Sequence, residues 1–455
     1  MRSLILLFLL SVIEARAQIQ LEPIEISDVT PPSAFSERSG SWPSYEVQQD
    51  ELIPGTRPIS DSLNTIPGLQ GRDQGSPTLS IRGSGQADRV LKLYEGIPLN
   101  FGDGLGASNL FIPEETIGSL RLLKGPSSVF YGPSAMAGAL DHRSRLFERK
   151  ALRLSVSDDS GLLGRRSVFL ATPFKPDSQL TLFAENAPGR FAYDSPLSGG
   201  RRESNSLETL RTTFNAKYDL GTTSVRPLLL LARQTGETPG ALNFPSSSKF
   251  RLHGTLAGIE SKTQLDQSNK ISFLFSDLRF WRSDEDSFGS SSYTNARTRL
   301  AADWGTRLFN DIELKTFTDL KTETLAATYL GDSKFTENSA ELGQSADVPL
   351  TDSLALQPAY RYLADTGTFV KALGLHHSTD RSVSWLTYSE GFRAPSLSDR
   401  FANFPNFRAN PSLKPETSRG LELGSRFEQG RRYGGFLEGI LIGGTVHATE
   451  FDQLF

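Results

Sequence analysis

Apolar and polar residues alternate along much of the chain after about residue 146. In residues 152–157 (LRLSVS) every second residue is apolar, and similar alternation occurs over 211–220 and 421–428. In a β-strand this arrangement places the apolar side chains on one face and the polar side chains on the other. Membrane β-barrels and soluble β-sandwiches both use such strands, so the pattern alone predicts strands without choosing between the two architectures.

Three further features favour a membrane barrel. The polar faces of these segments carry charges of both signs, as a hydrated barrel interior tolerates, and an export signal is present. The longest purely aliphatic run, 228–232, is too short for a spanning helix, so strands are expected to make any membrane contact. Aromatic residues near the expected strand ends are Trp281, Tyr293, Trp304, Tyr329, Tyr360, Tyr362, Trp385 and Tyr388.

The N-terminal segment has the layout of a secretory signal peptide. Arg2 precedes an apolar stretch from Leu4 to Ile13, and Ala15 and Ala17 supply the small residues expected before a cleavage site ahead of Gln18. A membrane anchor is the alternative, but this stretch is short for crossing about 30 Å of hydrocarbon as a helix. We therefore expect an exported protein.

Composition excludes several function classes. Hydrophobic residues make up 37% of the chain, charged residues 22%, and the net charge is −4, which suits neither a helical membrane bundle nor a nucleic-acid-binding protein. With 0 Cys and 5 His, disulfide scaffolds, thiolate chemistry and His-rich metal cages are excluded. His376 and His377 are neighbours that face opposite sides of a strand, so we expect a solvent-exposed pair rather than a metal site. No catalytic motif or phosphate loop is present, so neither an enzyme nor a cofactor is expected.

Residues 46–145 differ from the alternating segments in their residue pattern. Glycine is dense, the apolar segments are short, and residues 61–69 indicate a short helix that ends at Pro67 and Gly68. These features predict a compact α/β unit. The predicted organisation is a signal peptide at 1–17, a leader at 18–45, this α/β unit at 46–145 and a β-barrel at 146–455.

Five blocks around this unit resemble, in order and spacing, the plug domain of TonB-dependent outer-membrane receptors. They are LNTIPGL at 63–69, SIRG at 80–83, YEGIP at 94–98, LRLLKGPSS at 120–128 and YG at 131–132. The plug-motif residues are Arg82, Gly83, Glu95, Gly96, Arg121, Lys124, Gly125, Pro126, Tyr131 and Gly132.

A second, distant region is similar to the barrel motif of the same family. It consists of GFRAPS at 391–396, NPSLKPET at 410–417 and ELG at 422–424. The barrel-motif residues are Arg393, Pro395, Asn410, Pro411, Lys414, Glu416 and Glu422. The resemblance extends from about residue 20 to the last residue, although 150–380 match as pattern only.

The resemblance implies an antiparallel outer-membrane barrel of about 22 strands, closed by the N-terminal plug, that takes up a scarce nutrient. It also implies that the TonB protein of an inner-membrane complex delivers energy through an extended peptide near the mature N-terminus. Residues 22–29 suit that role, because Ile24 and Ile26 alternate without an internal glycine and can add as a strand to a partner's sheet. The expected TonB box consists of Pro23, Ile24, Glu25, Ile26 and Ser27; an ordinary disordered leader is the alternative.

The resemblance further implies that plug cations meet barrel glutamates. Arg82, Arg121 and Lys124 lie on or beside short plug strands, and we expect them to meet Glu416 and Glu422. Such pairs seat the plug yet remain weak enough to break under pulling. The alternative is that Arg121 and Lys124 are ordinary solvated strand residues.

Two features depart from the family pattern. Residues 137–140 run into Asp141, His142 and Arg143, which makes a last plug strand doubtful. The residues after 145 supply only about 14 for each of 22 strands, and spanning alone takes about 9–11, so long outer loops are not expected. Further strands follow the barrel motif in the family, so we expect a C-terminally shortened chain with an incomplete barrel.

A ferric siderophore is the expected ligand, with cobalamin or another small ligand as the alternative. A haem receptor of this family usually places a His between the motifs at 391–396 and 410–417, because haem iron needs an axial imidazole, and residues 396–409 contain none. The candidate ligand-binding residues are Arg400, Phe401, Phe404, Phe407 and Arg408, which packing explains equally well. A passive porin or adhesin is the other alternative. The expected partners are TonB, outer-membrane lipid and the ligand, with no nucleic acid.

Overall fold

A computed structural model describes most of the chain from residue 38 onward. The described residues are 38–39, 42–48, 69–72, 78–82, 84, 89–101, 112, 116–145, 147, 149–157, 165–175, 178–187, 191–193, 200–202, 206–241, 244–286, 289–330, 333–379, 382–402, 408–429 and 440–452. The predicted signal peptide, the TonB box and residues 61–68 of the helix predicted over 61–69 lie outside this set, and Leu69 is the first residue of a strand rather than part of a helix. None of the helices within it is long and apolar enough to cross a membrane.

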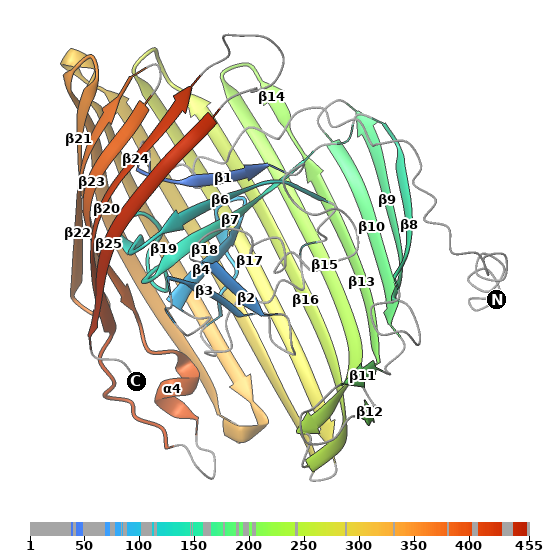
Figure 1. Ribbon diagram of the computed structural model, residues 1–455. Helices are drawn as coiled ribbons and strands as arrows, with labels where there is room; N and C mark the ends of the chain where they lie inside the picture. Colours follow the sequence, from blue (N-terminus) through green and yellow to red (C-terminus); the bar gives the residue numbers. More distant parts are fainter. Residues whose placement is uncertain are drawn as a thin grey trace.

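Most of the described chain forms one large curved sheet (Figure 1). Its 16 strands follow the order β25-β24-β23-β22-β21-β20-β19-β18-β17-β16-β15-β13-β10-β9-β8, with β14 paired to β15. All its strand pairs are antiparallel. The strands are β8 (Ala151–Ser157), β9 (Arg165–Lys175), β10 (Ser178–Ala187), β13 (Leu207–Ala216), β14 (Tyr218–Leu220), β15 (Thr223–Ala241), β16 (Phe244–Gln264), β17 (Asn269–Asp286), β18 (Gly289–Arg307), β19 (Glu313–Ala327), β20 (Lys334–Thr351), β21 (Leu354–Leu363), β22 (Thr368–Ser378), β23 (Ser382–Arg393), β24 (Glu416–Gln429) and β25 (Ile440–Asp452).

The sheet is a partial barrel. Among the described strands, β8 and β25 are the two ends of the sheet and do not pair with each other. Several strands are long: β16 has 21 residues, and β15 and β18 have 19 each. These strands extend well beyond the about 9–11 residues that spanning requires.

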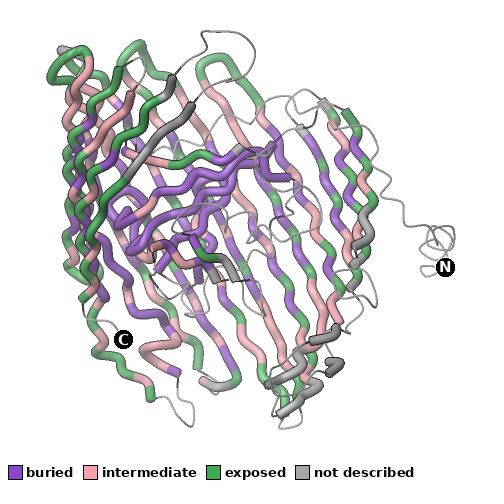
Figure 2. Tube along the Cα trace, viewed as in Figure 1, coloured by how far each residue is buried: buried purple, intermediate pink, exposed green. Residues whose placement is uncertain are grey.

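Side-chain alternation determines which face of the sheet points inward. On β17, Leu274 and Leu278 are buried against the interior while Phe273 and Phe275 face outward and are exposed. Figure 2 shows the same alternation of buried and exposed positions along neighbouring strands. Outward apolar residues of this kind form the belt that a barrel presents to lipid. The predicted dyad pattern is therefore present in the described strands.

The plug is a smaller sheet enclosed by the curved one. Its order is β1-β6-β7-β4-β5, and a separate hairpin joins β2 to β3. Among the described strands of this sheet, β4 and β7 are parallel and the other pairs are antiparallel. The elements are β1 (Tyr45–Gln48), β2 (Leu69–Arg72), β3 (Thr78–Ile81), β4 (Val90–Tyr94), β5 (Ile97–Pro98), β6 (Ile117–Lys124), α3 (Ser128–Tyr131) and β7 (Gly138–Ser144). Figure 2 shows that most of its described length is buried.

The last plug strand, which the sequence left in doubt, is present: β7 forms and is buried along its whole length. Its charged residues are tolerated because each has a partner. Asp141 accepts the Gly96 N–H at 3.1 Å, and the Nδ1 atom of His142 lies 2.8 Å from the Leu93 carbonyl oxygen. Arg143 lies 3.0 Å from the Glu46 carboxylate. A buried polar group costs little once it is hydrogen-bonded.

One side of the plug packs against the sheet through apolar contacts. Ile97, Leu99 and Phe101 of the plug belong to the same buried cluster as the inward residues of β15–β18, among them Leu256 and Phe280. The rings of Phe101 and Phe280 are 5.3 Å apart. Burying one such side chain contributes about 2 kcal/mol. We call this contact the apolar seam.

Candidate functional site

Successive connections alternate between the two ends of the strands, which we call the turn end and the loop end. At the turn end, short connections such as 265–268 and 352–353 join neighbouring strands. The loop end carries the connection 394–415 with helix α4 (Leu397–Phe401), and the hairpin of β11 (Phe191–Tyr193) and β12 (Gly200–Arg202) lies there as well (Figure 1). The plug lies inside the sheet, between these two ends (Figure 1).

Arg82 of the plug meets a barrel glutamate. Its Nη2 atom lies 2.7 Å from Oε2 of Glu422 on β24, one of the two positions expected from the sequence. The indole N–H of Trp385 donates to the other oxygen of that carboxylate at 2.8 Å. Trp385 therefore faces inward rather than toward a membrane border. Both charged side chains are largely buried, so salt screens the pair only weakly.

Glu416, the second expected partner, binds an arginine that the sequence analysis missed. Its fully buried carboxylate accepts from Arg89 at 3.0 and 3.1 Å and from Arg393 at 3.1 Å. Arg89 also donates to the Ser84 carbonyl at 3.0 Å, which ties it to the turn after β3. The expected kind of pair is present at Glu416, but its plug cation is Arg89.

Arg121 and Lys124 have neighbours within the plug. Arg121 donates to the Ser44 hydroxyl at 3.2 Å, and the Lys124 ammonium lies 4.2 Å from the centre of the Tyr45 ring. Burial lowers the pKa of Lys124, and the positive charge of Arg82 lowers it further. Arg121 is buried and Lys124 is half-buried, so neither is an ordinary solvated strand residue.

Two inward glycines accept the proline of the plug motif. A Cβ on Gly420 would lie 2.7 Å from Cδ of Pro126, and a Cβ on Gly391 would lie 3.0 Å from Cβ of Pro126 and from Cα of Met136. The Ser418 hydroxyl donates to the Met136 carbonyl at 2.8 Å beside this contact. The plug turn after Gly125, which has φ +95°, therefore lies directly on β23 and β24.

The Glu95–Gly96 turn joins β4 to β5 and contacts the barrel through a carboxylate. Both residues have positive φ, +51° and +75°, as a tight hairpin turn requires. Glu95 accepts from the Ser144 backbone at 2.8 Å and lies 3.1 Å from Arg226 on β15. Arg226 also lies 3.5 Å from Glu260 on β16. Here the plug supplies the anion and the barrel the cation, the reverse of the expected polarity.

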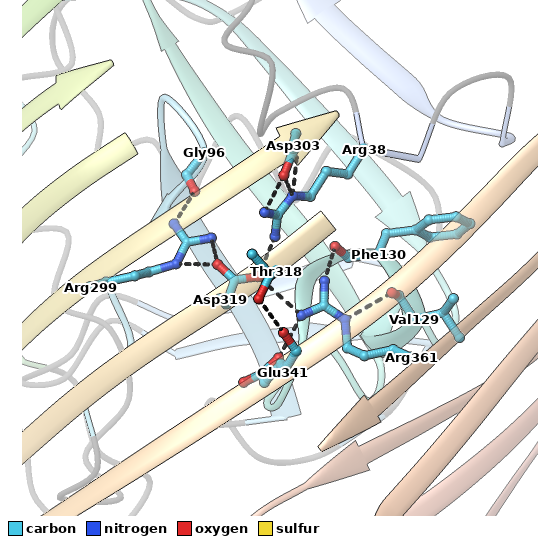
Figure 3. A network of polar contacts seen from close by, with 10 residues as sticks. All are labelled: Arg38, Gly96, Val129, Phe130, Arg299, Asp303, Thr318, Asp319, Glu341 and Arg361. Carbon is cyan, nitrogen blue, oxygen red and sulfur yellow. Dashed lines mark hydrogen bonds and ion pairs between the residues drawn. The ribbon is translucent and has the colours of Figure 1, made fainter. Parts of the chain in front are cut away.

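A network of charged side chains joins the N-terminal end of the described plug to the barrel (Figure 3). Arg38 lies 2.5 Å from Asp303 on β18 and 2.5 Å from Asp319 on β19. Burial acts to lower the pKa of Arg38, but the two carboxylates outweigh it and raise the pKa above its ordinary value. Arg38 is therefore held as a charged anchor inside the barrel.

Arg361 of β21 holds the short plug helix. It donates to the carbonyls of Val129 at 2.9 Å and Phe130 at 2.6 Å, and it lies 2.5 Å from Glu341 on β20 (Figure 3). A Cβ on Gly132 would lie 2.8 Å from the Glu341 carboxylate, and Gly132 has φ +85°. The glycine that ends the helix is thus required by both backbone conformation and space.

Arginines of β18 hold the plug segment from Gly96 to Asn100. Arg299 pairs with Asp319 and donates to the Gly96 carbonyl at 3.3 Å (Figure 3). Arg297 donates to the carbonyls of Pro98 and Asn100. Asp319 is therefore shared by Arg38, Arg299 and Arg361. We call this the Asp319 network; it consists of Arg38, Arg299, Asp303, Asp319, Glu341 and Arg361.

Sequence reasoning missed every member of this network. The sequence did contain part of the information needed to find these residues. Each barrel member lies at an inward position of an alternating strand, where a charge must find a partner or water. Which residues meet depends on strand register and on the placement of the plug, which a single sequence does not encode locally. Removing one partner of a buried ion pair typically costs about 3–5 kcal/mol.

A pocket opens at the loop end between the plug and the barrel wall. Plug residues of its lining include Asn100, Phe101, Tyr131 and Ser134, and residues 393–397 border it from β23 and the following connection. Its charged lining residues are Arg297, Arg299, Lys321 and Arg393 with Asp319, Glu323, Glu337 and Glu341, so positive and negative charges balance. None of the described lining residues is a histidine.

The candidate ligand residues lie beside this pocket or beyond the described chain. Phe401 stacks on Phe335 of β20 with ring centres 4.2 Å apart, and Arg400 lies 2.8 Å from Glu337. Both are therefore occupied by packing contacts. Arg408 is exposed, and Phe404 and Phe407 lie outside the described residues, as does Gly83.

The barrel-motif residues shape the connection that borders the pocket. Arg393 lies 3.3 Å from Asp399 and Pro395 lines the pocket. The Asn410 side chain accepts the Ser412 N–H at 3.0 Å, and Pro411 lies in the same turn. Lys414 is exposed.

The five histidines lie away from the loop-end pocket. His142 lies within the plug sheet, where burial lowers its pKa to about 4. His376 faces inward beside Trp42, with ring centres 6.1 Å apart, while the neighbouring His377 is exposed. The two therefore face opposite sides as expected, but His376 is buried rather than solvent-exposed. His253 faces outward, and His447 is exposed on β25.

Comparison with known protein families identifies the family of this chain. Residues 43–139 match the TonB-dependent Receptor Plug Domain, and residues 152–437 match the family described as TonB dependent receptor-like, beta-barrel. The chain belongs to the TonB-dependent receptor family. The predicted family and fold class, a partial membrane-type β-barrel with an N-terminal plug, are confirmed. Members of this family are receptors and transporters rather than enzymes.

Known relatives of this receptor include haem and siderophore proteins. The heme/hemopexin utilization protein C of Haemophilus influenzae strain Rd is 22% identical, with 91% of this chain and 70% of the relative covered. Among solved structures, the siderophore receptor PirA of Pseudomonas aeruginosa has a TM-score of 0.68 at 16% identity and covers 90% of this chain and 74% of its own. A mutant of the ferric enterobactin receptor PfeA of the same organism has a TM-score of 0.72 at 15% identity, covering 92% and 73%. Structural similarity at these identities shows the fold alone.

Proposed function

We propose that this receptor lies in the outer membrane and takes up a ferric siderophore, using energy delivered by TonB. The observation that carries the proposal is the loop-end pocket, whose floor is the plug itself. A ligand bound there contacts Tyr131 and the segment 98–101. Arg297 ties this segment to the barrel, and Arg299 and Arg361 hold the adjacent carbonyls of Gly96 and Phe130. Passage through the lumen requires the plug to move, which a passive porin does not need.

The absence of histidine from the described pocket lining supports an iron chelate rather than haem. Haem needs an axial ligand from its receptor, whereas a siderophore arrives with its iron already coordinated. A chelate is recognised by aromatic and polar surfaces, which Phe101, Tyr131 and the paired charges of the pocket supply. Haem is the second candidate, because the curated relatives named above are heme/hemopexin utilization proteins.

Growth under iron limitation distinguishes these ligands. The receptor is expressed in a Gram-negative host that lacks its own siderophore and haem receptors, and single purified ferric siderophores, haem or cobalamin are supplied. We expect growth with at least one ferric siderophore and none in a matched host without TonB. The ligand assignment would be overturned if haem supported growth and no siderophore did, or if the receptor rescued a cobalamin-requiring host and no siderophore supported growth. Growth that persists without TonB would overturn active uptake.

The Asp319 network suggests how the plug is held until it is pulled. Arg38, which precedes the plug, is the described residue closest in sequence to the proposed TonB box, and it is anchored on Asp303 and Asp319. Force applied to the leader therefore acts first on Arg38. Because Asp319 also binds Arg299 and Arg361, breaking the anchor changes the charge balance around the two arginines that hold α3 and the Gly96 turn.

A further inference from the structure

A second pocket lies on the inward face of the barrel wall at the turn end, the end of the sheet where β14 lies (Figure 1). It has a volume of about 270 Å³, and its described lining residues all belong to the barrel, from β14 to β19. Most of these residues are polar or charged, and they include Asp219, Lys262, Lys270, Ser272, Asp303 and Lys315. We call this cavity the turn-end pocket.

Strand register places Lys262 on the wall of this pocket. Lys262 on β16 lies opposite Ser272 on β17, which in turn lies opposite Asp303 on β18. Asp303 faces inward, because it binds Arg38 inside the barrel. Directly opposite residues of antiparallel strands share a face, so the Lys262 side chain also points into the lumen.

Two more lysines lie one inward step closer to the turn end. Lys270 on β17 and Lys315 on β19 both lie opposite Gly305 on β18, one on each side of it. A Cβ on Gly305 would lie 2.8 Å from Cε of Lys270, so the Lys270 side chain crosses the glycine toward β19. Neighbouring strands are about 4.8 Å apart and inward steps about 7 Å, so the three ammonium groups can surround one small ligand.

The lining of the turn-end pocket carries more positive than negative charge. The two carboxylates among its described lining residues, Asp219 and Asp303, each bind a cation from outside the lining. Asp219 lies 2.9 Å from Lys217, and Asp303 lies 2.5 Å from Arg38. These two carboxylates therefore do not balance the three lysines of the lining.

Carboxylates just outside the lining also have arginine partners. Glu313, two residues before Lys315, lies 2.9 Å from Arg307. Glu260 lies 3.5 Å from Arg226 and 3.9 Å from Lys262, so it compensates the charge of Lys262 in part. The pocket as a whole keeps an excess of positive charge.

The turn-end pocket and the loop-end pocket lie on the same wall. Along β18, Arg299 lines the loop-end pocket and Asp303 lines the turn-end pocket (Figure 3). These positions are four residues apart, which is about 14 Å along a strand. Ala301 lies between them and belongs to the buried cluster of the apolar seam. A ligand that leaves the loop-end pocket along this wall, as the plug moves, therefore reaches the turn-end pocket next.

We propose that the turn-end pocket is a release-side binding site for an anionic ferric chelate. The proposal rests on the uptake function proposed above, with the chelate moving from the loop end to the turn end. The ammonium groups bind carboxylate or catecholate oxygens through charge-assisted hydrogen bonds, and Ser272 adds a hydroxyl donor. Lysine side chains are flexible and strongly hydrated, which suits a site that must also let its ligand leave.

Charge and size specify the class of ligand. In the loop-end pocket positive and negative charges balance, so charge does not exclude a neutral chelate there. The turn-end pocket favours an anion, and it therefore adds a selection by charge that the loop-end pocket lacks. Its volume of about 270 Å³ is near the lower end of the range for small-ligand pockets, about 300–1,000 Å³, which favours a compact chelate over a peptide.

Lysine footprinting of the purified full chain in detergent tests this proposal. An amine-acylating reagent is applied at increasing concentrations of ferric citrate, an anionic chelate, and the modification of each lysine is measured by mass spectrometry after digestion. A bound anion should slow the modification of the turn-end lysines at least about three-fold; they are Lys262, Lys270 and Lys315. The internal controls are exposed lysines outside the pocket and should change less than about 1.5-fold; they are Lys249, Lys334 and Lys371. A neutral ferric trihydroxamate should protect neither set.

A double variant tests the contribution of charge. In Lys270→Gln/Lys315→Gln, Lys262 remains as the reporter. The ferric citrate concentration that half-protects Lys262 should rise about four-fold, a factor of about two for each charge removed. The matched control Lys249→Gln/Lys371→Gln should leave that concentration within about 1.5-fold of the natural chain. Lys270→Arg/Lys315→Arg keeps the charge and should retain the protection, which gives a second test if the glutamine variant does not fold.

Four results would overturn the proposal: no protection of the turn-end lysines, equal protection of the exposed controls, equal protection by the neutral chelate, or an unchanged half-protecting concentration in the glutamine variant. Protection by a glutamate-rich peptide but not by ferric citrate would overturn it as well, because the pocket would then bind a peptide. Footprinting involves no uptake, so its failure leaves the siderophore proposal standing. The growth test measures uptake alone, so its failure beside a positive footprint would separate the two proposals.

Discussion

Single glycines decide how closely the plug approaches the barrel. Gly391 and Gly420 leave space for Pro126, and Gly132 leaves space for the Glu341 carboxylate. The sequence identified Gly132 and Pro126 through their motifs, but gave no reason for Gly420. The reason is a contact between segments far apart in the chain, which becomes visible only when the plug and the barrel are placed together.

Gly132→Ala should destabilise the seating of the plug more than glycine replacement elsewhere. A Cβ would lie 2.8 Å from Glu341, and Gly132 also has φ +85° and ψ −159°, a conformation that is essentially confined to glycine and costs another residue about 1–3 kcal/mol. Overpacking adds about 1–3 kcal/mol. The control is Gly367→Ala, where φ is +64° but no atom lies within 4 Å of the added Cβ. Denaturant unfolding and limited proteolysis of the plug measure the difference; equal losses for both variants would contradict the contact.

His142 should make the plug sensitive to mild acid. Its pKa falls from the ordinary 6.5 to about 4 in the folded protein, chiefly because burial disfavours the charged imidazole. The unfolded chain therefore takes up a proton between pH 6.5 and 4 that the folded plug does not, and stability falls as pH is lowered through this window by up to about 3 kcal/mol. Above pH 6.5 this contribution is constant.

The matched variant for this effect is His142→Gln. Glutamine retains an N–H donor for the Leu93 carbonyl but does not titrate. Unfolding free energies measured at pH 7 and at pH 4.5 should diverge less in this variant than in the natural chain, since carboxylates contribute equally to both. An identical pH dependence in the two proteins would show that His142 does not contribute.

Strands were predictable from the sequence because their alternation is local. The segments at 152–157 and 421–428 lie in strands, 211–220 is divided between β13 and β14, and the polar face is the inward one. The last plug strand was doubted because charges in a buried strand are costly unless they are partnered. The partners of Asp141 and Arg143 come from the Glu95–Gly96 turn and from β1, which are distant in the sequence. Register and the lateral order of strands likewise depend on distant residues.

The contact between β20, β21 and helix α3 should depend on Arg361. Arg361→Met removes a hydrogen-bond donor from the Glu341 carboxylate and from the carbonyls of Val129 and Phe130. The expected cost is about 3–5 kcal/mol in unfolding free energy. Adding Glu341→Gln removes one buried charge and should recover part of this loss. Denaturant unfolding followed by intrinsic fluorescence gives both values.

An exposed pair provides the control for this cycle. Arg307 lies 2.9 Å from Glu313 at the turn end, where both side chains are about half exposed. Arg307→Met should cost less than about 1 kcal/mol, and Glu313→Gln should restore little. A cost for Arg361→Met as small as that of the exposed pair would show that the Asp319 network does not hold the plug.

In the whole molecule, the plug is held to the barrel by the apolar seam and by a set of charged contacts. Apolar contacts with β15–β18 exclude water and resist sliding through burial, whereas the Asp319 network and the Arg82–Glu422 and Arg89–Glu416 pairs hold it through charges. Charged contacts can be exchanged for water as a segment is withdrawn, because each ion regains hydration. The charged side is therefore where we expect the plug to yield first.

The proposed TonB box predicts a separation of binding from uptake. Ile24→Pro removes a backbone N–H and fixes φ, so an extended peptide can no longer add to the edge of a partner sheet. The loop-end pocket shares Asp319 with the Arg38 anchor, and the substitution at residue 24 changes neither of these side chains. We expect uptake of whichever ferric siderophore supports growth to be lost, while its binding to membranes containing the receptor stays within about two-fold of the natural chain. Ile24→Val keeps the donor and the strand propensity and should transport normally. Normal energy-dependent uptake by the proline variant, at equal amounts in the membrane, would place the TonB box elsewhere in the leader.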